Sequence, residues 1–174
     1  MFDDEAPITA PCQATPSLSA LDLLALAGRS ASRVACEQSL AVETAARLFE
    51  GAATSQATVW IAGDAAFEHA HRLEAAGHRA VALVDPTRLP ATVRAGDVLF
   101  VVGVGELPIG LLPLARQRDV DTIVLGGAPR RQLDADAVMF VDCRDERAVE
   151  LTHTFIVMAL CAQYLDIDRA ESAA

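Results

Sequence analysis

Lysine is missing from this sequence of 174 residues, and all 14 of its basic residues are arginine. This absence excludes every chemistry that needs a lysine amine, such as Schiff-base formation, the lysine of a phosphate-binding P-loop and general-base catalysis by lysine. A phosphorelay receiver domain is disfavoured for the same reason, because its last strand would lack the lysine it requires.

Positive charge is scarce as well, since 24 acidic residues outnumber the 14 basic ones and give a formal net charge of -10. Nucleic acid and anionic lipid both need a cationic surface, so we expect neither as a partner. Aromatic residues make up only 5% of the chain against 52% hydrophobic residues. The core is therefore expected to consist mostly of alanine, valine and leucine.

Signals for export or membrane insertion are also lacking. The first residues are acidic and have no signal-peptide pattern. The four cysteines, Cys12, Cys36, Cys143 and Cys161, form no C-x-x-C pair, which favours reduced thiols and a cytoplasmic location. The apolar stretch 98–115 contains one charge, Glu106, but glycines and prolines interrupt it, so we expect a strand, a loop and a helix there.

The length of the chain suits one domain, which we place at residues 17–168 between tails at 1–16 and 169–174. Two helices are expected first, one over 20–27 that ends at Gly28 and one over 32–50. Strands and helices then alternate. The expected strands are 58–63, 79–84, 98–102, 122–125 and 137–141, and the expected helices are 65–76, 108–118 and 146–165.

These strands are continuous hydrophobic runs, which is typical of parallel strands covered on both faces. Alternation with helices implies βαβ crossovers, so we predict a three-layer α/β/α sandwich around a five-stranded parallel sheet, preceded by two helices. The last helix is apolar nearly all round between Phe155 and Cys161, which predicts that it also meets another subunit.

Several short motifs occur in an order typical of one family. They are Trp60–Asp64, Gly96–Leu99, Leu114–Arg118, Asp136–Val141, and Glu150 with His153. Over residues 20–165 the sequence thereby resembles the sugar-isomerase (SIS) family, most closely its phosphoheptose-isomerase-like branch. The resemblance implies a flavodoxin-like sheet, dimers or tetramers, and a phosphosugar site at the carboxyl ends of the strands. Members isomerise aldose and ketose phosphates or bind phosphosugars as regulatory ligands.

The phosphate-binding loops depart from the pattern of that family. Where the family has Gly-Asn-Gly-Gly-Ser after the first strand, residues 63–67 read Gly-Asp-Ala-Ala-Phe, and the loop 102–108 after the third strand has no hydroxyl. Hydroxyls and amides at a helix N-terminus hold phosphate. Asp64 and Glu106 would repel a phosphate dianion, whereas the amides of Gly103 and Gly105 remain for a weaker or neutral ligand. The predicted ligand-binding residues are Gly63, Asp64, Ala65, Gly103, Val104, Gly105 and Glu106.

The resemblance also suggests catalytic residues, with Glu74 as the base and with Glu150 and His153 assisting. The last-helix histidine of the family falls at Val157, and His153 lies one turn earlier. Because His71 and Glu74, and likewise Glu150 and His153, are three residues apart, each pair is expected on one helix face. Together these four side chains could hold zinc or another divalent ion. The alternative is that they are half-exposed polar residues without a metal. The proposed isomerisation itself requires no cofactor.

Further histidines and arginines carry weaker signals. His69 and His71 are two residues apart, so they point to different sides of a helix and are expected to be ordinary surface histidines. Arg130 and Arg131 could bind an anion, with solvated surface charge as the alternative.

We therefore expect a self-associating protein that binds a sugar phosphate or related carbohydrate derivative and could act as an aldose–ketose phosphate isomerase. One alternative is a catalytically inactive module that oligomerises or senses a ligand. Another is a nucleotide-binding Rossmann-like domain, because Gly63 ends the first strand and Asp85 follows the second. That domain would, however, need a G-x-G-x-x-G spacing that is not present.

Overall fold

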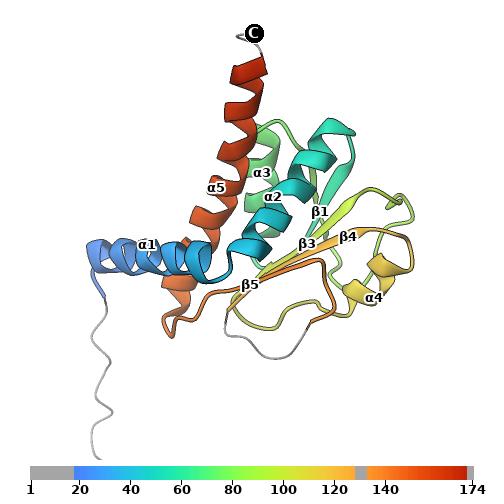
Figure 1. Ribbon diagram of the computed structural model, residues 1–174. Helices are drawn as coiled ribbons and strands as arrows, with labels where there is room; N and C mark the ends of the chain where they lie inside the picture. Colours follow the sequence, from blue (N-terminus) through green and yellow to red (C-terminus); the bar gives the residue numbers. More distant parts are fainter. Residues whose placement is uncertain (1–17, 128–132, 172–174) are drawn as a thin grey trace, which may run out of the picture.

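The computed structural model describes residues 18–127 and 133–171, with side chains described up to Ala162 (Figure 1). The expected tail at 1–16 and the pair Arg130–Arg131 lie outside the described residues. At the other end α5 (Glu146–Glu171) continues past the expected end at 165, so residues 169–171 are helical.

A five-stranded sheet forms the centre of the molecule, and every neighbouring pair of strands is parallel, as predicted. The strands are β1 (Thr58–Gly63), β2 (Arg79–Ala82), β3 (Val98–Gly103), β4 (Asp121–Gly126) and β5 (Ala137–Phe140). Their order in the sheet is β2-β1-β3-β4-β5. The order reverses direction between β1 and β3, and open sheets of this kind bind ligands at such a switch point.

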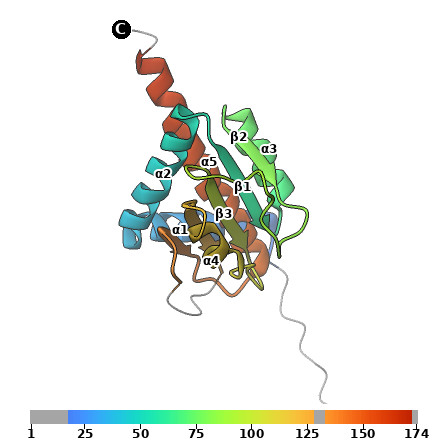
Figure 2. The ribbon, with the colours of Figure 1, turned by 90° about the vertical axis from the view of Figure 1, so that its right-hand side faces the viewer.

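Helices cover the sheet on both faces and give the predicted three layers. On one face α2 (Ser39–Thr54), α3 (Ala66–Ala75) and α5 bury a core that includes Phe49, Leu73 and Phe100. On the other face lie the short α4 (Leu111–Arg116) and the irregular connector from β2 to β3, packed around Trp60 and Leu99. Figure 2 shows α4 in front of the sheet and α5 behind it.

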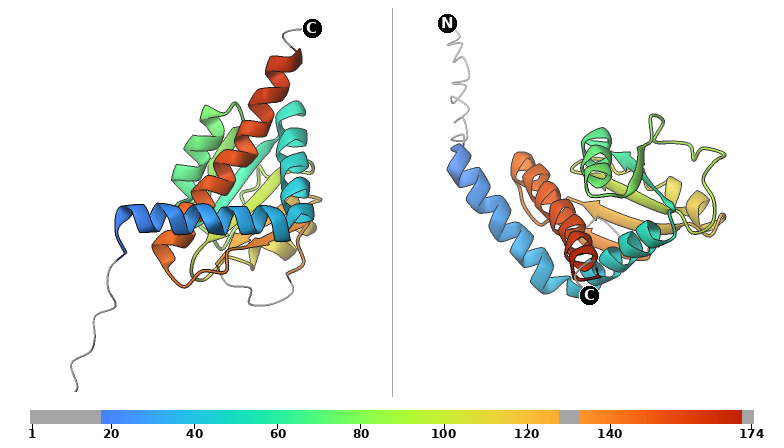
Figure 3. Two further views of the ribbon diagram at one scale, coloured as in Figure 1. Left: turned by 60° about the vertical axis from the view of Figure 1, so that its left-hand side comes forward. Right: turned by 90° about the horizontal axis from the view of Figure 1, so that it is seen from above.

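The first helix differs from the prediction. α1 (Ala20–Glu37) passes through Gly28 without a break, and the chain interrupts the helix only at Gln38. The helix persists because Ala27 and Val34, seven residues apart, are both buried. α5 lies between α1 and the sheet (Figure 3), and the buried Thr152 Oγ1 of α5, which donates to the Ala148 carbonyl at 2.6 Å, lies 3.3 Å from the carbonyl of Ala27.

The aspartate of the Gly96–Leu99 motif has a structural role. Asp97 is 1% exposed and accepts hydrogen bonds from the Thr58 amide at 2.9 Å, the Trp60 indole at 3.0 Å and the Arg94 amide at 3.1 Å. A buried carboxylate needs several donors to compensate for lost hydration. Asp97 therefore ties the amino end of β3 to β1 and leaves the opposite edge of the sheet free for a site.

None of the helices in the described part of the chain combines the length and the apolar character needed to cross a membrane.

Candidate functional site

A cleft of about 990 Å³ opens at the carboxyl ends of β1 and β3, at the switch point of the sheet. Three segments line it: residues 63–68 at the start of α3, residues 83–87 without 85 after β2, and residues 106–110 after β3. Parallel strands bring their following loops to one edge, so segments far apart in the sequence meet there. This cleft is the candidate ligand site.

The turn after β1 requires glycine at one position. Gly63 has φ +114°, and a Cβ atom there would overlap the carbonyl oxygen of Val102 in β3. The same carbonyl accepts a hydrogen bond from the amide of Asp64 at 2.9 Å. The close approach of the two strands thus fixes the turn and directs the chain into α3 at the rim of the cleft.

The carboxylate of Asp64 occupies the position beside the loop after β3 where an anionic ligand could otherwise bind. Asp64 Oδ2 accepts a hydrogen bond from the amide of Val104 at 3.1 Å, and it packs closely against Gly103. Ala65, which precedes α3, has no side-chain cap to offer. The protein therefore supplies its own anion to the loop after β3, which leaves the Val104 amide unavailable to a phosphate.

The walls of the cleft are negatively charged. Asp64, Glu68 and Glu106 line it, and no arginine or histidine does so among the described residues. Arg72 forms an ion pair with Glu68 one turn along α3 and lowers the pKa of that carboxyl, first through a hydrogen bond and then through its charge. Asp64 and Glu106 have no such cationic partner in the described part of the chain.

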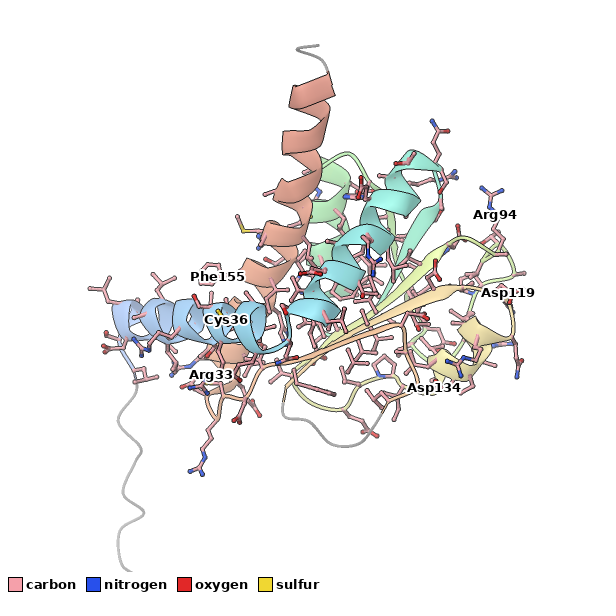
Figure 4. All side chains as sticks on the ribbon, viewed as in Figure 1. Arg33, Cys36, Arg94, Asp119, Asp134 and Phe155 are labelled. Atoms are coloured by element: carbon pink, nitrogen blue, oxygen red, sulfur yellow. The ribbon has the colours of Figure 1, made fainter. Side chains whose placement is uncertain are left out.

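The arginines nearest to the cleft in the described part of the chain do not line it. Arg88 and Arg118 line a second hollow beside Trp60, which adjoins the cleft at Leu83 and Val84. Arg116 forms an ion pair with Asp134. Figure 4 shows Arg94 at the rim near Asp119, on the side of the molecule opposite α1. A phosphate in the cleft would thus meet carboxylates without a described guanidinium to balance its charge.

Apolar side chains form the remainder of the cleft surface. Phe67 is 69% exposed, Val84 85% and Ile109 44%, and each comes from a different one of the three lining segments. Single exposed apolar residues are common on proteins, but three around one cleft indicate a surface for the apolar part of a ligand.

His153 lies at the same edge of the sheet but inside the protein. It is 2% exposed, and its Nε2–H donates to the carbonyl of Gly126, at the end of β4, at 3.2 Å. Burial lowers the pKa of His153 to about 4, and the charge of His69 lowers it further. The hydrogen bond to Gly126 and the charge of Asp64 act in the opposite direction and raise the pKa. His153 is therefore neutral at pH 7 and ties α5 to the carboxyl edge of the sheet.

The expectation for His69 is wrong, because this residue is 3% exposed and tilts against the ring of Phe100. It shares the inner face of α3 with Ala66, Ala70 and Leu73. Burial lowers the pKa of His69 as well, and its Nδ1 has no hydrogen-bond partner in the described residues. Its spacing from Leu73, one helical turn, was the signal in the sequence that could have revealed this.

The predicted catalytic residues are dispersed. Glu74 is exposed and lies at the end of α3 away from the cleft, eight residues and about 12 Å of helix beyond Ala66. His71 and Glu150 are exposed too, and neither lines the cleft. Of the predicted four, only His153 lies at the carboxyl edge of the sheet.

The predicted metal set does not assemble within one chain. No three His, Cys, Asp or Glu side chains of the described residues lie close enough to bind a metal ion. The spacing predicted that the members of each pair share one helix face, but Glu150 is exposed and His153 is buried although they are only three residues apart. A zinc or other divalent site in this protein stays a prediction from the sequence.

The predicted ligand-binding residues divide into two groups. Gly63, Asp64, Ala65 and Glu106 line the cleft, whereas Gly103 and Val104 lie behind the carboxylate of Asp64. Gly105 is exposed beside Glu106. The sequence did not predict that the segments 83–87 and 107–110 line the cleft. These loops carry no motif, and they lie at the cleft because the order of the strands places their ends side by side.

Comparison with known proteins identifies the fold. No protein-family model matches this sequence, and no curated protein resembles it significantly. Among solved structures, phosphoheptose isomerase GmhA from Neisseria gonorrhoeae is similar with a TM-score of 0.70 at 20% identity, over 82% of this chain and 93% of the other. The sugar isomerase domain of the RpiR transcription factor from Sphaerobacter thermophilus gives a TM-score of 0.64 at 20% identity, over 88% and 98%.

The NanR protein of Vibrio vulnificus, in complex with ManNAc-6P, is also similar, with a TM-score of 0.57 at 17% identity over 83% of this chain and 62% of the other. The structures that this chain resembles are SIS-domain proteins, and its fold is the SIS fold. Identities this low establish the fold alone.

Proposed function

We propose that this chain is a carbohydrate-binding module, which holds a carbohydrate derivative in the cleft at the carboxyl ends of β1 and β3. The observation that carries the proposal is the position of the cleft at the switch point of an SIS sheet. Sugar phosphates are named for proteins of the same fold, including ManNAc-6P in NanR. The mixture of apolar walls and a few polar groups suits a sugar, which has faces of both kinds.

Binding without turnover is the best-supported form of this function. Isomerisation needs a base beside the carbon that loses its proton, and the predicted base, Glu74, is remote from the cleft within one chain. A module that senses a ligand, or that binds it for a partner, needs only the cleft.

Aldose–ketose isomerisation is the second candidate, and one observation favours it. The carboxylate of Asp64 after β1 and the buried imidazole of His153, which contacts the carbonyl at the end of β4, both lie at the carboxyl edge of the sheet. Such a pair can accept and return a proton. Formation of ketose from aldose, followed by NMR in the native protein and in a His153→Gln variant, tests this candidate.

Self-association is part of the proposal. Large apolar side chains remain exposed on the helices of one face: Leu21 and Leu24 on α1, Leu40 on α2 and Met158 on α5. Exposed apolar side chains on helices can be covered by another molecule, and a second copy of this chain suits the predicted homodimer or homotetramer. Light scattering on the purified protein measures the number of subunits.

We also place the protein in the cytoplasm.

The binding function is tested by filling the cleft. Gly110 lines it, has ordinary helical backbone angles and has open space where a Cβ would lie, so Gly110→Phe fits the backbone and occupies the cleft. Gly51 of α2 also has open space at its Cβ and lies outside the cleft, which makes Gly51→Phe the matched control.

Saturation-transfer NMR against a panel of free, aminated and phosphorylated hexoses gives the readout. We expect a signal from at least one carbohydrate in the native protein and in Gly51→Phe, and its loss in Gly110→Phe. Binding that survives Gly110→Phe, or a panel without any signal, contradicts the proposal.

A further inference from the structure

The charge on the walls of the cleft selects among carbohydrate derivatives. Asp64 and Glu106 lie on two of the three segments that line it, and no described cation is placed between them. Two unit charges near a protein surface interact with several kcal/mol at about 4 Å, so a ligand with a phosphate and a ligand with an amine would differ strongly in affinity.

The backbone of the cleft supports the same selection. Loops after parallel strands bind phosphate through amides that have no other acceptor. Here the amide of Val104 already donates to Asp64 Oδ2, and the first turn of α3 carries Glu68. A phosphate would have to displace a carboxylate of the protein in order to reach that amide.

Phe67 supplies an independent preference for positive charge. Its ring is 69% exposed at the wall of the cleft, two residues beyond Ala65, and has no aromatic partner in the described residues. The face of an aromatic ring attracts a cation and also packs against the C–H face of a sugar ring. A sugar that carries an ammonium group satisfies the ring and the carboxylates together.

We propose that the ligand of the cleft is an amino sugar with a free, protonated amine and without a phosphate. Its ammonium group pairs with Asp64 and Glu106, and its sugar ring packs on Phe67. This inference rests on the proposed function, because it takes the cleft as the carbohydrate site and adds the chemical class of the ligand.

Isothermal titration calorimetry on the native full chain tests the inference. The probes are glucosamine, galactosamine and mannosamine, their neutral parent hexoses, glucosamine 6-phosphate, and 1,4-diaminobutane as an amine without a sugar. We expect at least one amino sugar to bind about tenfold more tightly than its neutral parent, and glucosamine 6-phosphate to bind more weakly than glucosamine. Raising the salt concentration should weaken the binding of the amino sugar.

Two variants locate the charge that is responsible. Asp64→Asn keeps an oxygen that can accept from the Val104 amide but removes the negative charge, and Glu106→Gln removes the second charge. Each should weaken amino-sugar binding about tenfold and leave the neutral hexose unchanged, whereas Glu43→Gln, an exposed position on α2 outside the cleft, should have no effect.

The outcomes separate this inference from the proposed function. If a neutral or phosphorylated hexose binds as tightly as every amino sugar, or if Asp64→Asn leaves amino-sugar affinity intact, the inference is overturned while the carbohydrate site remains. If only 1,4-diaminobutane binds, or if no probe binds, both the inference and the proposed function are overturned.

Discussion

The side-chain amide of Gln38 pairs with the backbone of Phe140 as a neighbouring strand would. Its Nε2 donates to the carbonyl of Phe140 at 2.7 Å, and its Oε1 accepts from the amide of Phe140 at 2.8 Å. β5 is an edge strand, so these backbone groups have no other strand to pair with on that side. The pairing also explains why the helical chain is interrupted at Gln38, between α1 and α2.

Replacing Gln38 should therefore destabilise the whole domain. Gln38→Ala leaves two half-buried backbone groups without a partner, and we expect the free energy of unfolding to fall by about 2 kcal/mol. Urea unfolding measures it. Gln117→Ala, at an exposed glutamine after α4, should change stability by less than about 0.5 kcal/mol. Equal effects of the two substitutions would show that the pairing with Phe140 contributes nothing.

Gly28→Ala tests the continuity of α1. The glycine lies in the middle of the helix, and a Cβ there would meet open space, so the substitution should raise the free energy of unfolding by about 0.5–1 kcal/mol. If Gly28 instead ended a helix in a left-handed conformation, as the sequence predicted, the same substitution would lower stability.

Gly63→Ala tests the turn that begins the cleft. With φ +114° and no space beside the Val102 carbonyl, an alanine forces β1 and β3 apart. We expect a loss of more than about 3 kcal/mol, seen as a lower melting temperature or as failure to fold. Gly105→Ala, at a position with open space and no positive φ, is the matched control and should behave like the native protein. A well-folded Gly63→Ala variant contradicts the described turn.

Asp97→Asn should destabilise the amino edge of the sheet. Asp97 Oδ2 accepts from both the Trp60 indole and the Arg94 amide, and an amide nitrogen at that position would face two donors. We expect a loss of about 2–4 kcal/mol. Trp60 is the one tryptophan of the chain, so its fluorescence reports the change directly. Asp119→Asn, at an exposed aspartate of the same rim, serves as the control.

His153 makes stability depend on pH. Its folded pKa of about 4 lies below the ordinary value of 6.5, so the unfolded chain binds a proton more readily than the folded one. Stability is full above pH 6.5, falls as the pH drops below 6.5 and levels off near pH 4, with a loss of about 3 kcal/mol from this group. Burial of His69 and His78 lowers their pKa values and acts in the same direction.

Chemical denaturation between pH 7.5 and 4 measures this dependence. His153→Gln keeps a side-chain donor for the Gly126 carbonyl and should make the profile less steep, whereas His71→Gln, at an exposed histidine, should leave it unchanged. A native profile that is already flat over this range would contradict the buried, neutral state of His153.

Hydrophobic runs were sufficient to predict the parallel sheet and its flanking helices, because strands buried on both faces cannot alternate polar and apolar residues. The break at Gln38 was not predictable, since its cause is a partner 102 residues away. The burial of His69 was readable from its spacing to Leu73, but a histidine gives a weaker hydrophobic signal than leucine. Asp64 was predicted to repel phosphate, whereas its bond to the Val104 amide needed the structure.

Glu74 shows why motif spacing alone misplaces catalytic groups. The resemblance suggested Glu74 as the base, but the direction of α3 takes it away from the carboxyl edge of the sheet. The family resemblance suggests roles for residues from their positions in the sequence alone. The fold determines which end of each helix lies at the ligand site.

A crystal structure of the protein soaked with an amino sugar that binds in calorimetry will show where the ligand lies. We expect electron density for the sugar in the cleft, with its amine near Asp64 and Glu106 and its ring on Phe67. Density in the hollow lined by Trp60, Arg88 and Arg118, or in any place away from the carboxyl ends of β1 and β3, would contradict this expectation.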